Sequence, residues 1–250
     1  MNYAIDHCEP FDQKKENPWM KAEHVGRYLF CADFFKGKKA KKLLDVACAE
    51  GFGSQILMNH GSFVFGADIN PEYIRTARSR CKEGSFVVMD FDHDDFPASF
   101  AEADGAACFE TVEHVIDGGG LLRKLSRCIK QDGYLILSFP NSTFEKIDAH
   151  GYNYDPFHQK IYMRDEMLQL IGDAGLVLEG EFGQTLCNLL FAAECDAVDS
   201  GRLVQAEIDG LFQYNRTAIT RLAKLIGYPT QYCIEKSYSY IWILKKVKNM

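Results

Sequence analysis

Short apolar runs alternate with segments of helical spacing along most of the chain. Runs of this kind are typical of buried strands in a parallel sheet, with helices covering both faces. The repetition predicts an α/β fold with a doubly wound, mostly parallel sheet of seven strands and an antiparallel last strand. The predicted strands are 43–48, 63–67, 85–89, 105–109, 133–139, 176–182 and 237–244, and the predicted helices between them lie near 54–59, 71–81 and 121–129.

Two regions depart from this alternation. An N-terminal helix is expected over 18–35, and a helical insert over 184–235. The insert is interpreted as a cap over the site or a homo-oligomer contact, and additional core is the alternative. We expect a single domain made of an N-terminal helical cap, a core, the insert and a final strand, over residues 1–40, 41–183, 184–235 and 236–250.

Composition narrows the class of protein. The net charge is −7 and no long Lys/Arg stripe occurs, which disfavours nucleic acid as a partner. The apolar runs are too short to span a bilayer, and the first residues do not resemble a secretory signal. The nine cysteines form no Cys-x-x-Cys pair, which favours reduced thiols and a cytoplasmic location.

The turn after the first strand is made of small and acidic residues, and reads Ala-Cys-Ala-Glu-Gly-Phe-Gly. Small side chains at Ala47, Ala49 and Gly51 would let a ligand lie directly against the backbone. Asp45 and Glu50 put negative charge where a dinucleotide would carry its pyrophosphate. A cofactor with an ammonium and a sulfonium group is therefore favoured over a dinucleotide.

Acidic residues also follow the second and third strands. Asp68 ends the second strand, where a carboxylate could accept hydrogen bonds from both hydroxyls of a ribose, and Ile69 could cover one face of an adenine. Asp90 follows the third strand and could accept a bond from the adenine amino group, with Phe91 beside it. Together with Asp45 of the first strand, Asp68 and Asp90 make three acids in order along successive strands, which indicates a nucleoside site. Each of them alone is typical of a loop or a helix cap.

These segments resemble the motifs of class I S-adenosylmethionine-dependent methyltransferases, especially those found beside sugar-modifying and small-molecule pathways. Residues 43–53 resemble the first motif, 64–78 the second, the surroundings of Asp90 the adenine-binding motif, and 108–115 the segment after strand four. The resemblance implies a Rossmann-like fold, methyltransferase activity and S-adenosylmethionine as the cofactor, with Phe109 among the residues that bind it.

The resemblance covers about residues 17–176 and fades in the insert 184–235, where we expect the acceptor to be selected. One departure concerns the first motif, in which the family has glycines where this chain has Ala47 and Ala49. A methyl group is a small addition, so binding is expected to survive. Ahead of the first strand, Arg27 lies on what resembles the family's entry helix and could pair with a carboxylate.

Polar residues after the fourth strand carry the candidate chemistry. Glu110, Glu113 and His114 lie where ligands of open α/β sheets gather. His114 is the candidate base for a hydroxyl acceptor, because its ordinary pKa lies near neutrality. A structural histidine that caps the following helix is the alternative.

A metal site is the second interpretation of the same residues. Glu110, Glu113 and His114, joined by His158 from a later loop, would suit Mg²⁺ or Mn²⁺, or Zn²⁺. The set is similar to that of metal-assisted methyltransferases acting on ubiquinone precursors and on small-RNA 3′ ends. The aromatic segment 150–158 resembles the family's loop over the active site.

The sequence therefore predicts an S-adenosylmethionine-dependent enzyme that methylates oxygen of a small acceptor, such as a sugar or a phenol-like molecule. Two alternatives remain open: a metal-dependent methyltransferase of RNA 3′ ends, and a degenerate cofactor-binding scaffold. A dinucleotide oxidoreductase is a more distant alternative.

Overall fold

The computed structural model describes residues 10–11, 18–144, 157–204 and 216–247, and all structural statements concern these residues. Helices and strands alternate as the apolar pattern predicts. In chain order the elements are α1 (Pro18–Gly37), β1 (Lys42–Val46), α2 (Phe52–Asn59), β2 (Phe63–Asp68), α3 (Pro71–Arg80), β3 (Ser85–Val88), η1 (Ala98–Phe100), β4 (Ala103–Phe109), α4 (Gly118–Cys128), β5 (Ile129–Pro140), α5 (Arg164–Asp173), β6 (Leu176–Gly183), α6 (Thr185–Asp199), α8 (Arg216–Leu222), η2 (Ala223–Gly227), η3 (Ile234–Lys236) and β7 (Ser239–Lys246).

The seven strands form one sheet in the order β3-β2-β1-β4-β5-β7-β6. β7 is antiparallel to both β5 and β6, and the remaining neighbours pair in parallel. This confirms the predicted doubly wound sheet with an antiparallel last strand, a Rossmann-like methyltransferase fold. The register sets Val46 beside Ala67 and Cys108, so β1, β2 and β4 finish at the same edge of the sheet.

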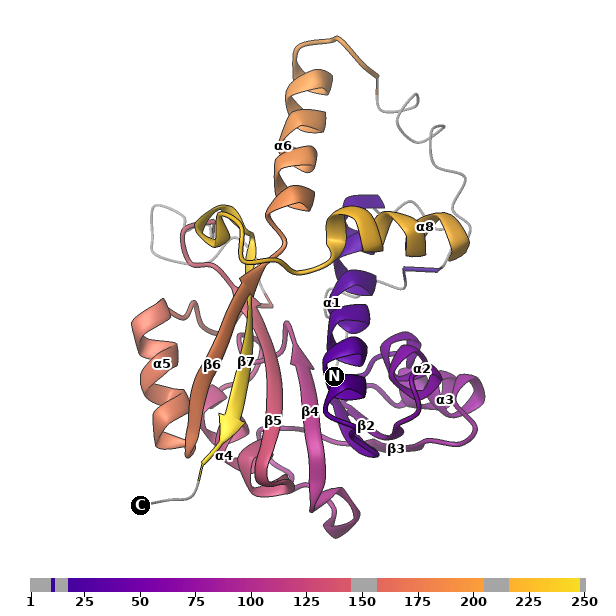
Figure 1. Cartoon of the computed structure of the whole chain (residues 1–250), viewed down its shortest axis with the longest axis vertical. Helices are drawn as coiled ribbons and strands as arrows, with labels where there is room; N and C mark the ends of the chain where they lie inside the picture. The colour runs from indigo at the N-terminus through magenta and orange to yellow at the C-terminus, as the bar shows by residue number, and fades with distance from the viewer. Residues whose placement is uncertain (1–9, 12–17, 145–156, 205–215, 248–250) are drawn as a thin grey trace.

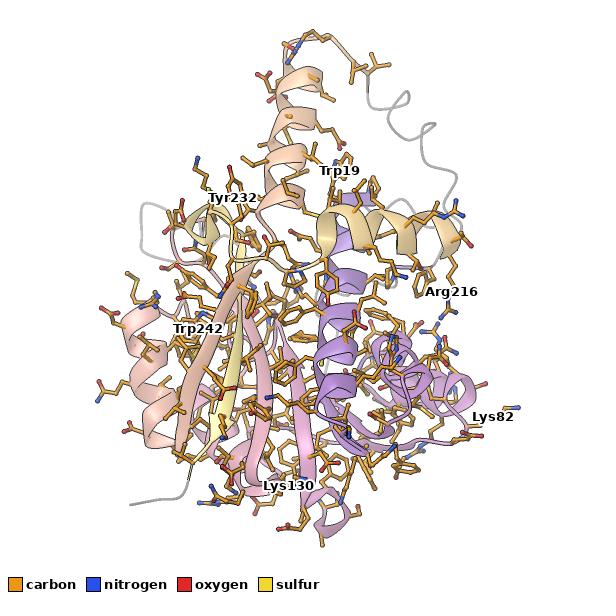
Figure 2. All side chains as sticks on the ribbon, viewed as in Figure 1. Trp19, Lys82, Lys130, Arg216, Tyr232 and Trp242 are labelled. Carbon is orange, nitrogen blue, oxygen red and sulfur yellow. The ribbon has the colours of Figure 1, made fainter. Side chains whose placement is uncertain are left out.

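Alternation along the strands divides the core into two layers. On β1, Leu44 and Val46 join the cluster that packs α4 and α5, while Leu43 joins the cluster that contains α1 and α2. β7 alternates in the same way, and Trp242 is fully buried on the α4 and α5 side. Figure 2 shows Trp242 among the side chains that fill the space around the sheet. Asp45 shares the orientation of Leu43 and therefore points toward α1 and α2.

The insert builds the end of the molecule at which the parallel strands finish. α6 begins directly after β6 and projects away from the sheet (Figure 1). Large apolar side chains on it are exposed, namely Leu186, Leu189, Leu190 and Phe191. Most of the predicted helical pattern over 203–212 lies outside the described residues. The oligomer contact and the division of the domain at 40, 183 and 235 stay predictions.

α1 and η2 touch through glycines. A methyl group on Gly26 would lie 1.9 Å from the carbonyl oxygen of Gly227, and one on Gly227 would lie 2.1 Å from that of Ala22. Backbone can approach backbone this closely only because neither position has a side chain. The same region is held by Gln184, whose side-chain amide donates to the carbonyls of Glu23 and Gly227. None of the described helices is long and apolar enough to cross a membrane.

We predict that Gly26→Ala lowers the free energy of unfolding by about 1–3 kcal/mol, because the added methyl must force two backbones apart. Gly172→Ala is the matched control, since nothing lies within 4 Å of its added methyl. This control is expected to be neutral or to stabilise by about 1 kcal/mol, the helix preference of alanine. Urea unfolding measures both, and equal stabilities of the two variants would contradict the contact.

Candidate functional site

A cavity of about 500 Å³ opens at the edge where β1, β2 and β4 finish. Its walls come from α1, from the loops after the first four strands, from the segment around His158 and from the first turns of α6. This volume is in the range that holds a ligand of cofactor size. Open α/β sheets bind ligands at this same edge.

Most of the predicted cofactor residues line this cavity. They are Ala47, Ala49, Asp68, Ile69, Asp90, Phe91 and Phe109. The two others, Asp45 and Gly51, are buried and do not line it. A methyl group on Gly51 would meet Ala77 of α3 at 3.0 Å, so this glycine serves the packing of the turn against a helix.

The loop after β1 has an unusual backbone. Ala47 and Ala49 have φ values of 57° and 45°, in the left-handed region, and Gly51 has 79°. Residues with a Cβ pay about 1–2 kcal/mol there. Glycine has no Cβ and would avoid this strain, which is the physical reason for the glycines that the resembled motif has at these two positions. The conformation is held by neighbouring strands, since the Cys48 amide donates to the Ala67 carbonyl.

Asp68 contacts the same loop. One carboxylate oxygen accepts the amide hydrogen of Ala49 and the other accepts that of Asn70, each at 2.9 Å. Each carboxylate oxygen can accept more than one hydrogen bond. Asp68 is 7% exposed and faces the cavity, so it is held in place by the backbone and can still accept bonds from a ligand.

Asp45 has a different environment from the one that its place in the motif suggests. It is fully buried, and its two oxygens accept the hydroxyls of Tyr28 at 2.8 Å and Ser54 at 2.5 Å. Burial raises its pKa to about 6, against the opposing effect of these two hydrogen bonds. The strand alternation turns its carboxylate toward α1 and α2, so of the three acids predicted for the cofactor only Asp68 and Asp90 line the cavity.

Glu110 is held by the sheet and by α1. It follows β4 with a left-handed φ of 44°. Its carboxylate accepts the hydroxyls of Ser138 at 2.5 Å and Ser239 at 3.0 Å, and lies 3.2 Å from Nη1 of Arg27. The predicted four-residue metal set is therefore divided, because the group of ligand atoms that lie close together contains the other three residues without Glu110.

Arg27 pairs with carboxylates, as the sequence suggested, and it does so in the interior. It is 3% exposed, donates through Nε to Gln184 at 2.7 Å, and lies 3.9 Å from Glu23 and 3.2 Å from Glu110. Burial raises the pKa of Glu23 to about 7; Arg27 lowers that pKa and Glu110 raises it further. The single guanidinium thus neutralises only part of the local negative charge.

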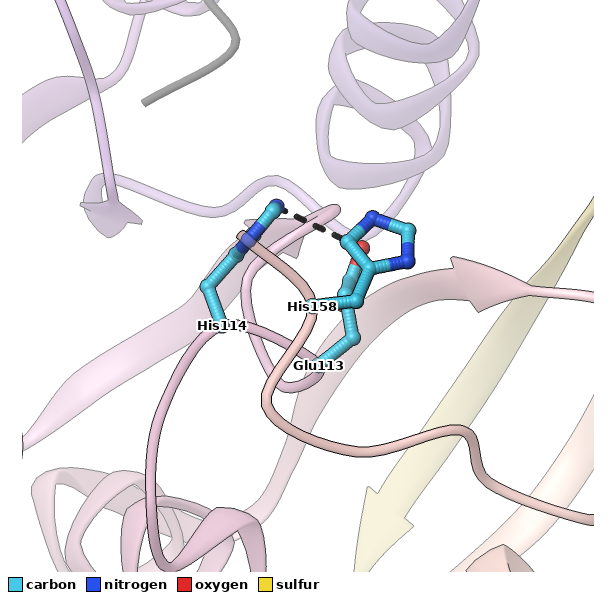
Figure 3. Close-up of side chains that lie close together, drawn as sticks. All are labelled: Glu113, His114 and His158. Carbon is cyan, nitrogen blue, oxygen red and sulfur yellow. Dashed lines mark ion pairs between the residues drawn. The ribbon is translucent and has the colours of Figure 1, made fainter. Parts of the chain in front are cut away.

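Glu113, His114 and His158 form a compact group (Figure 3). One ligand atom from each lies within 4.8 Å of the others, and the two imidazole rings meet edge to face with centroids 4.9 Å apart. Glu113 is 1% exposed. Its carbonyl accepts the amide hydrogens of Gln159 at 2.7 Å and Lys160 at 3.2 Å, which fixes the segment that carries His158.

The tautomer of His114 follows from its contacts. Nδ1 lies 3.0 Å from the Phe157 carbonyl oxygen, which can only accept a hydrogen bond. Nδ1 therefore carries the proton, and neutral His114 has its lone pair on Nε2, which lies 3.9 Å from Oε1 of Glu113. A nitrogen of this kind can take a proton or bind a metal ion.

Several cavity residues were not identified as site residues from the sequence. Cys187, Asn188 and Phe191 come from α6, and Tyr238 precedes β7. Trp19, labelled in Figure 2, lines the cavity too. Its indole nitrogen donates to Glu194 of α6. Trp19 lies on the helix that resembles the family's entry helix, whereas no local motif marks Tyr238 or the residues of α6, which the fold alone brings to the cavity. Of the aromatic segment 150–158, residues 150–156 lie outside the described residues.

We predict that Glu23 makes stability fall as pH rises from about 4.5 to 7. The raised pKa means that the folded state binds more protons than the unfolded state in this window, so folding is favoured at its acidic end. Relative to Glu23→Gln, the wild type should lose about 1–3 kcal/mol across it. Urea unfolding at several pH values measures both proteins, and parallel curves would contradict the raised pKa.

Comparison with known proteins agrees with this geometry. Residues 44–137 match the family model described as a methyltransferase domain. Over 173 residues the chain is 27% identical to a "Probable S-adenosylmethionine-dependent methyltransferase" of Mycobacterium tuberculosis, covering 68% of this chain and 60% of the relative. It is 32% identical over 116 residues to a ubiquinone biosynthesis O-methyltransferase of Histophilus somni, covering 44% and 49%.

A solved structure shows the same fold. Magnesium protoporphyrin IX methyltransferase from Synechocystis PCC 6803, with bound S-adenosylhomocysteine, superposes with a TM-score of 0.59 at 12% identity, covering 95% of this chain and 91% of that one. The chain spans about 60% of the length of the mycobacterial relative. Sequence and fold agree: residues 44–137 match a methyltransferase domain, and the chain has the Rossmann-like fold of a methyltransferase.

Proposed function

We propose that this protein transfers the methyl group of S-adenosylmethionine to a hydroxyl oxygen of a small acceptor, such as a sugar or a phenol-like molecule. The observation that carries this proposal is that one cavity contains both the acids predicted for the cofactor and a histidine whose neutral form has its lone pair on Nε2. Asp68 and Asp90 represent the first group and His114 the second. The methyltransferase domain over 44–137 supports it independently.

Each expected contact with the cofactor can be assigned to particular residues of this chain. Asp68 would accept the ribose hydroxyls, because its two oxygens are held by backbone amides and face the cavity. Asp90 and Phe91 would hold the adenine, together with Ile69. Ala47 and Ala49 would expose backbone to the methionine end, with Phe109 beside it.

The charge of the cavity selects against anionic acceptors. Among the described lining residues, six carboxyl groups face a single guanidinium, that of Arg27; they belong to Glu23, Asp68, Asp90, Asp92, Glu110 and Glu113. Glu23, with its pKa raised to about 7, is only partly ionised near neutral pH. A cavity that concentrates one sign of charge repels ligands of the same sign. This favours a neutral or cationic acceptor and disfavours a phosphate-bearing RNA end. Trp19, Phe191 and Tyr238 offer apolar surface for a ring.

His114 would act as the base in the transfer. Bound S-adenosylmethionine supplies an activated methyl group on a sulfonium. Nε2 of His114 would take the hydroxyl proton of the acceptor as its oxygen forms the new bond to the methyl carbon. The carbon–sulfur bond would break in the same step, with its electron pair left on sulfur. Nδ1–H would keep the ring in place through the Phe157 carbonyl. Positioning of the two reacting molecules by the cavity walls supplies the rest.

A metal-assisted reaction is the second candidate, because Glu113, His114 and His158 gather one nitrogen or oxygen ligand atom each. Mg²⁺, Mn²⁺ or Zn²⁺ bound there would polarise the acceptor hydroxyl, and Nε2 of His114 would be a ligand in place of a base. The negative cavity is compatible with either role. Dependence of turnover on a divalent ion separates the two.

We predict that Asp68→Ala weakens binding of S-adenosylhomocysteine by roughly 10- to 100-fold, the loss of one or two charge-assisted hydrogen bonds. Calorimetric titration of wild type and variant measures it. Asp33→Ala, an acid of α1 that does not line the cavity, is the control and should bind as the wild type does. Absence of binding to the wild type would favour the degenerate scaffold.

We predict that His114→Ala lowers the turnover number by about 10²- to 10⁴-fold, the usual contribution of a general base, with little change in cofactor affinity. The assay follows formation of S-adenosylhomocysteine with a panel of neutral sugars and phenols. Turnover that persists after treatment with a chelator supports the base. Turnover that is lost with a chelator and restored by Mg²⁺ or Mn²⁺ would instead support the metal-assisted reaction.

A further inference from the structure

Asp45 connects three elements around the cofactor loop. Its backbone lies on β1 directly before the loop, one oxygen accepts the Ser54 hydroxyl from the first turns of α2, and the other accepts the Tyr28 hydroxyl from α1. The Ser54 bond joins the two ends of the loop. The Tyr28 bond attaches the loop to a helix that lies before the matched methyltransferase domain in the sequence.

The ring of Tyr28 packs against residues of the cofactor loop and of the first turn of α2. A methyl group on Gly53 would lie 2.1 Å from Cζ of Tyr28, so the ring occupies the space above this glycine. The ring also meets Phe52 and Phe109 edge-on, with centroids 5.1 Å and 5.0 Å apart. Phe52, Phe109 and Tyr28 all line the cavity, while the Tyr28 hydroxyl is committed to Asp45.

The loop needs external support. Ala47 and Ala49 lie in the left-handed region, where each residue with a Cβ is strained by about 1–2 kcal/mol. Strained backbone persists only where its surroundings over-determine it. In this chain the support comes from the Ala49 bond to Asp68 on one side and from the Asp45 bonds at the base.

We propose that Tyr28 is a positioning residue for the cofactor, which acts through Asp45 to hold the strained loop in its binding shape. The proposal rests on the proposed function, because it assumes that the loop binds S-adenosylmethionine. It explains why Gly53 has no side chain and why the motif acid is buried away from the cavity. It also makes docking of α1 and binding of the cofactor mutually dependent.

The first test is Tyr28→Phe, which removes one oxygen and keeps the ring. Its affinity for S-adenosylhomocysteine, measured by calorimetry, should fall about 3- to 10-fold, the range for one buried hydrogen bond. Tyr228→Phe is the matched control. Tyr228 also donates to an aspartate on α1, Asp33, at 3.1 Å, and it does not line the cavity. The control should bind within twofold of the wild type.

The second test is a double-mutant cycle with Asp45→Asn. If Tyr28 acts through Asp45, the double variant should bind S-adenosylhomocysteine about as weakly as the weaker of the two single variants. Independent residues would instead give a loss of affinity equal to the product of the two single losses. Melting temperatures are recorded in parallel, and all titrations are made well below the transition. A residue that only stabilises the fold would lower the melting temperature and leave the affinity of the folded protein unchanged.

The pH profile provides an independent readout. The Tyr28 hydrogen bond lowers the pKa of Asp45, so its loss should move the acidic limit of cofactor binding to higher pH. Asp68 also acts on this carboxyl and raises its pKa. Asp45 in turn raises the pKa of four nearby thiols, those of Cys31, Cys48, Cys81 and Cys108. These groups are the same in both proteins, so the difference between the profiles reports the Tyr28 bond.

The outcomes are distinct. The proposal is supported if the wild type binds S-adenosylhomocysteine, Tyr28→Phe binds it more weakly with a shifted pH profile, and Tyr228→Phe binds it as the wild type does. Wild-type binding with equal affinity of Tyr28→Phe, or strictly multiplicative effects in the cycle, overturns it and leaves the proposed function intact. Failure of the wild type to bind S-adenosylhomocysteine overturns both.

Discussion

The ion pair between Arg27 and Glu110 is the interaction on which the arrangement of the site depends. It joins α1, which covers one face of the sheet, to the end of β4 at the cavity. A buried ion pair needs additional hydrogen bonds to offset its loss of solvation. Ser138 and Ser239 donate to Glu110, and Gln184 accepts from Nε of Arg27. Among the described residues, the buried Nη1 of Arg27 has only the ion pair with Glu110. Five separate parts of the chain thereby meet around one pair of charges, and the cavity lies among them.

This network also explains how the two carboxylates after β4 differ. Glu110 and Glu113 are three residues apart, and the sequence suggested a shared site for both. The left-handed backbone at Glu110 turns its side chain toward the sheet and α1, whereas Glu113 lies in the group with the two histidines. One acid therefore serves the architecture and the other remains beside the candidate chemistry. Spacing alone could not separate them, because the direction of each side chain is set by contacts with β5, β7 and α1.

The sheet was predictable because its signal is local. Apolar runs, the proline at the start of α3 and the small residues after β1 each mark an element within a few positions, and the observed strands agree with them to within a few residues. The acids at the ends of β2 and β3 were predictable for the same reason, since parallel strands bring those ends together. The environment of Asp45 was missed although strand alternation turns it toward α1. The insert was expected as a cap over the site, but the individual contributions of Tyr28, Gln184 and the residues of α6 were missed. They arise from contacts between residues 17 to 175 positions apart.

The close approach of α1 and η2 at Gly26 and Gly227 has a consequence for exchanging parts between relatives. The insert and the N-terminal helix were read as separate additions to a core, yet they share backbone contact and the amide of Gln184. A chimera that receives another protein's insert would bring in a surface shaped for a different first helix. Transplanting acceptor preference onto this scaffold would therefore require both segments to move as one unit, although more than a hundred residues of core lie between them in the sequence.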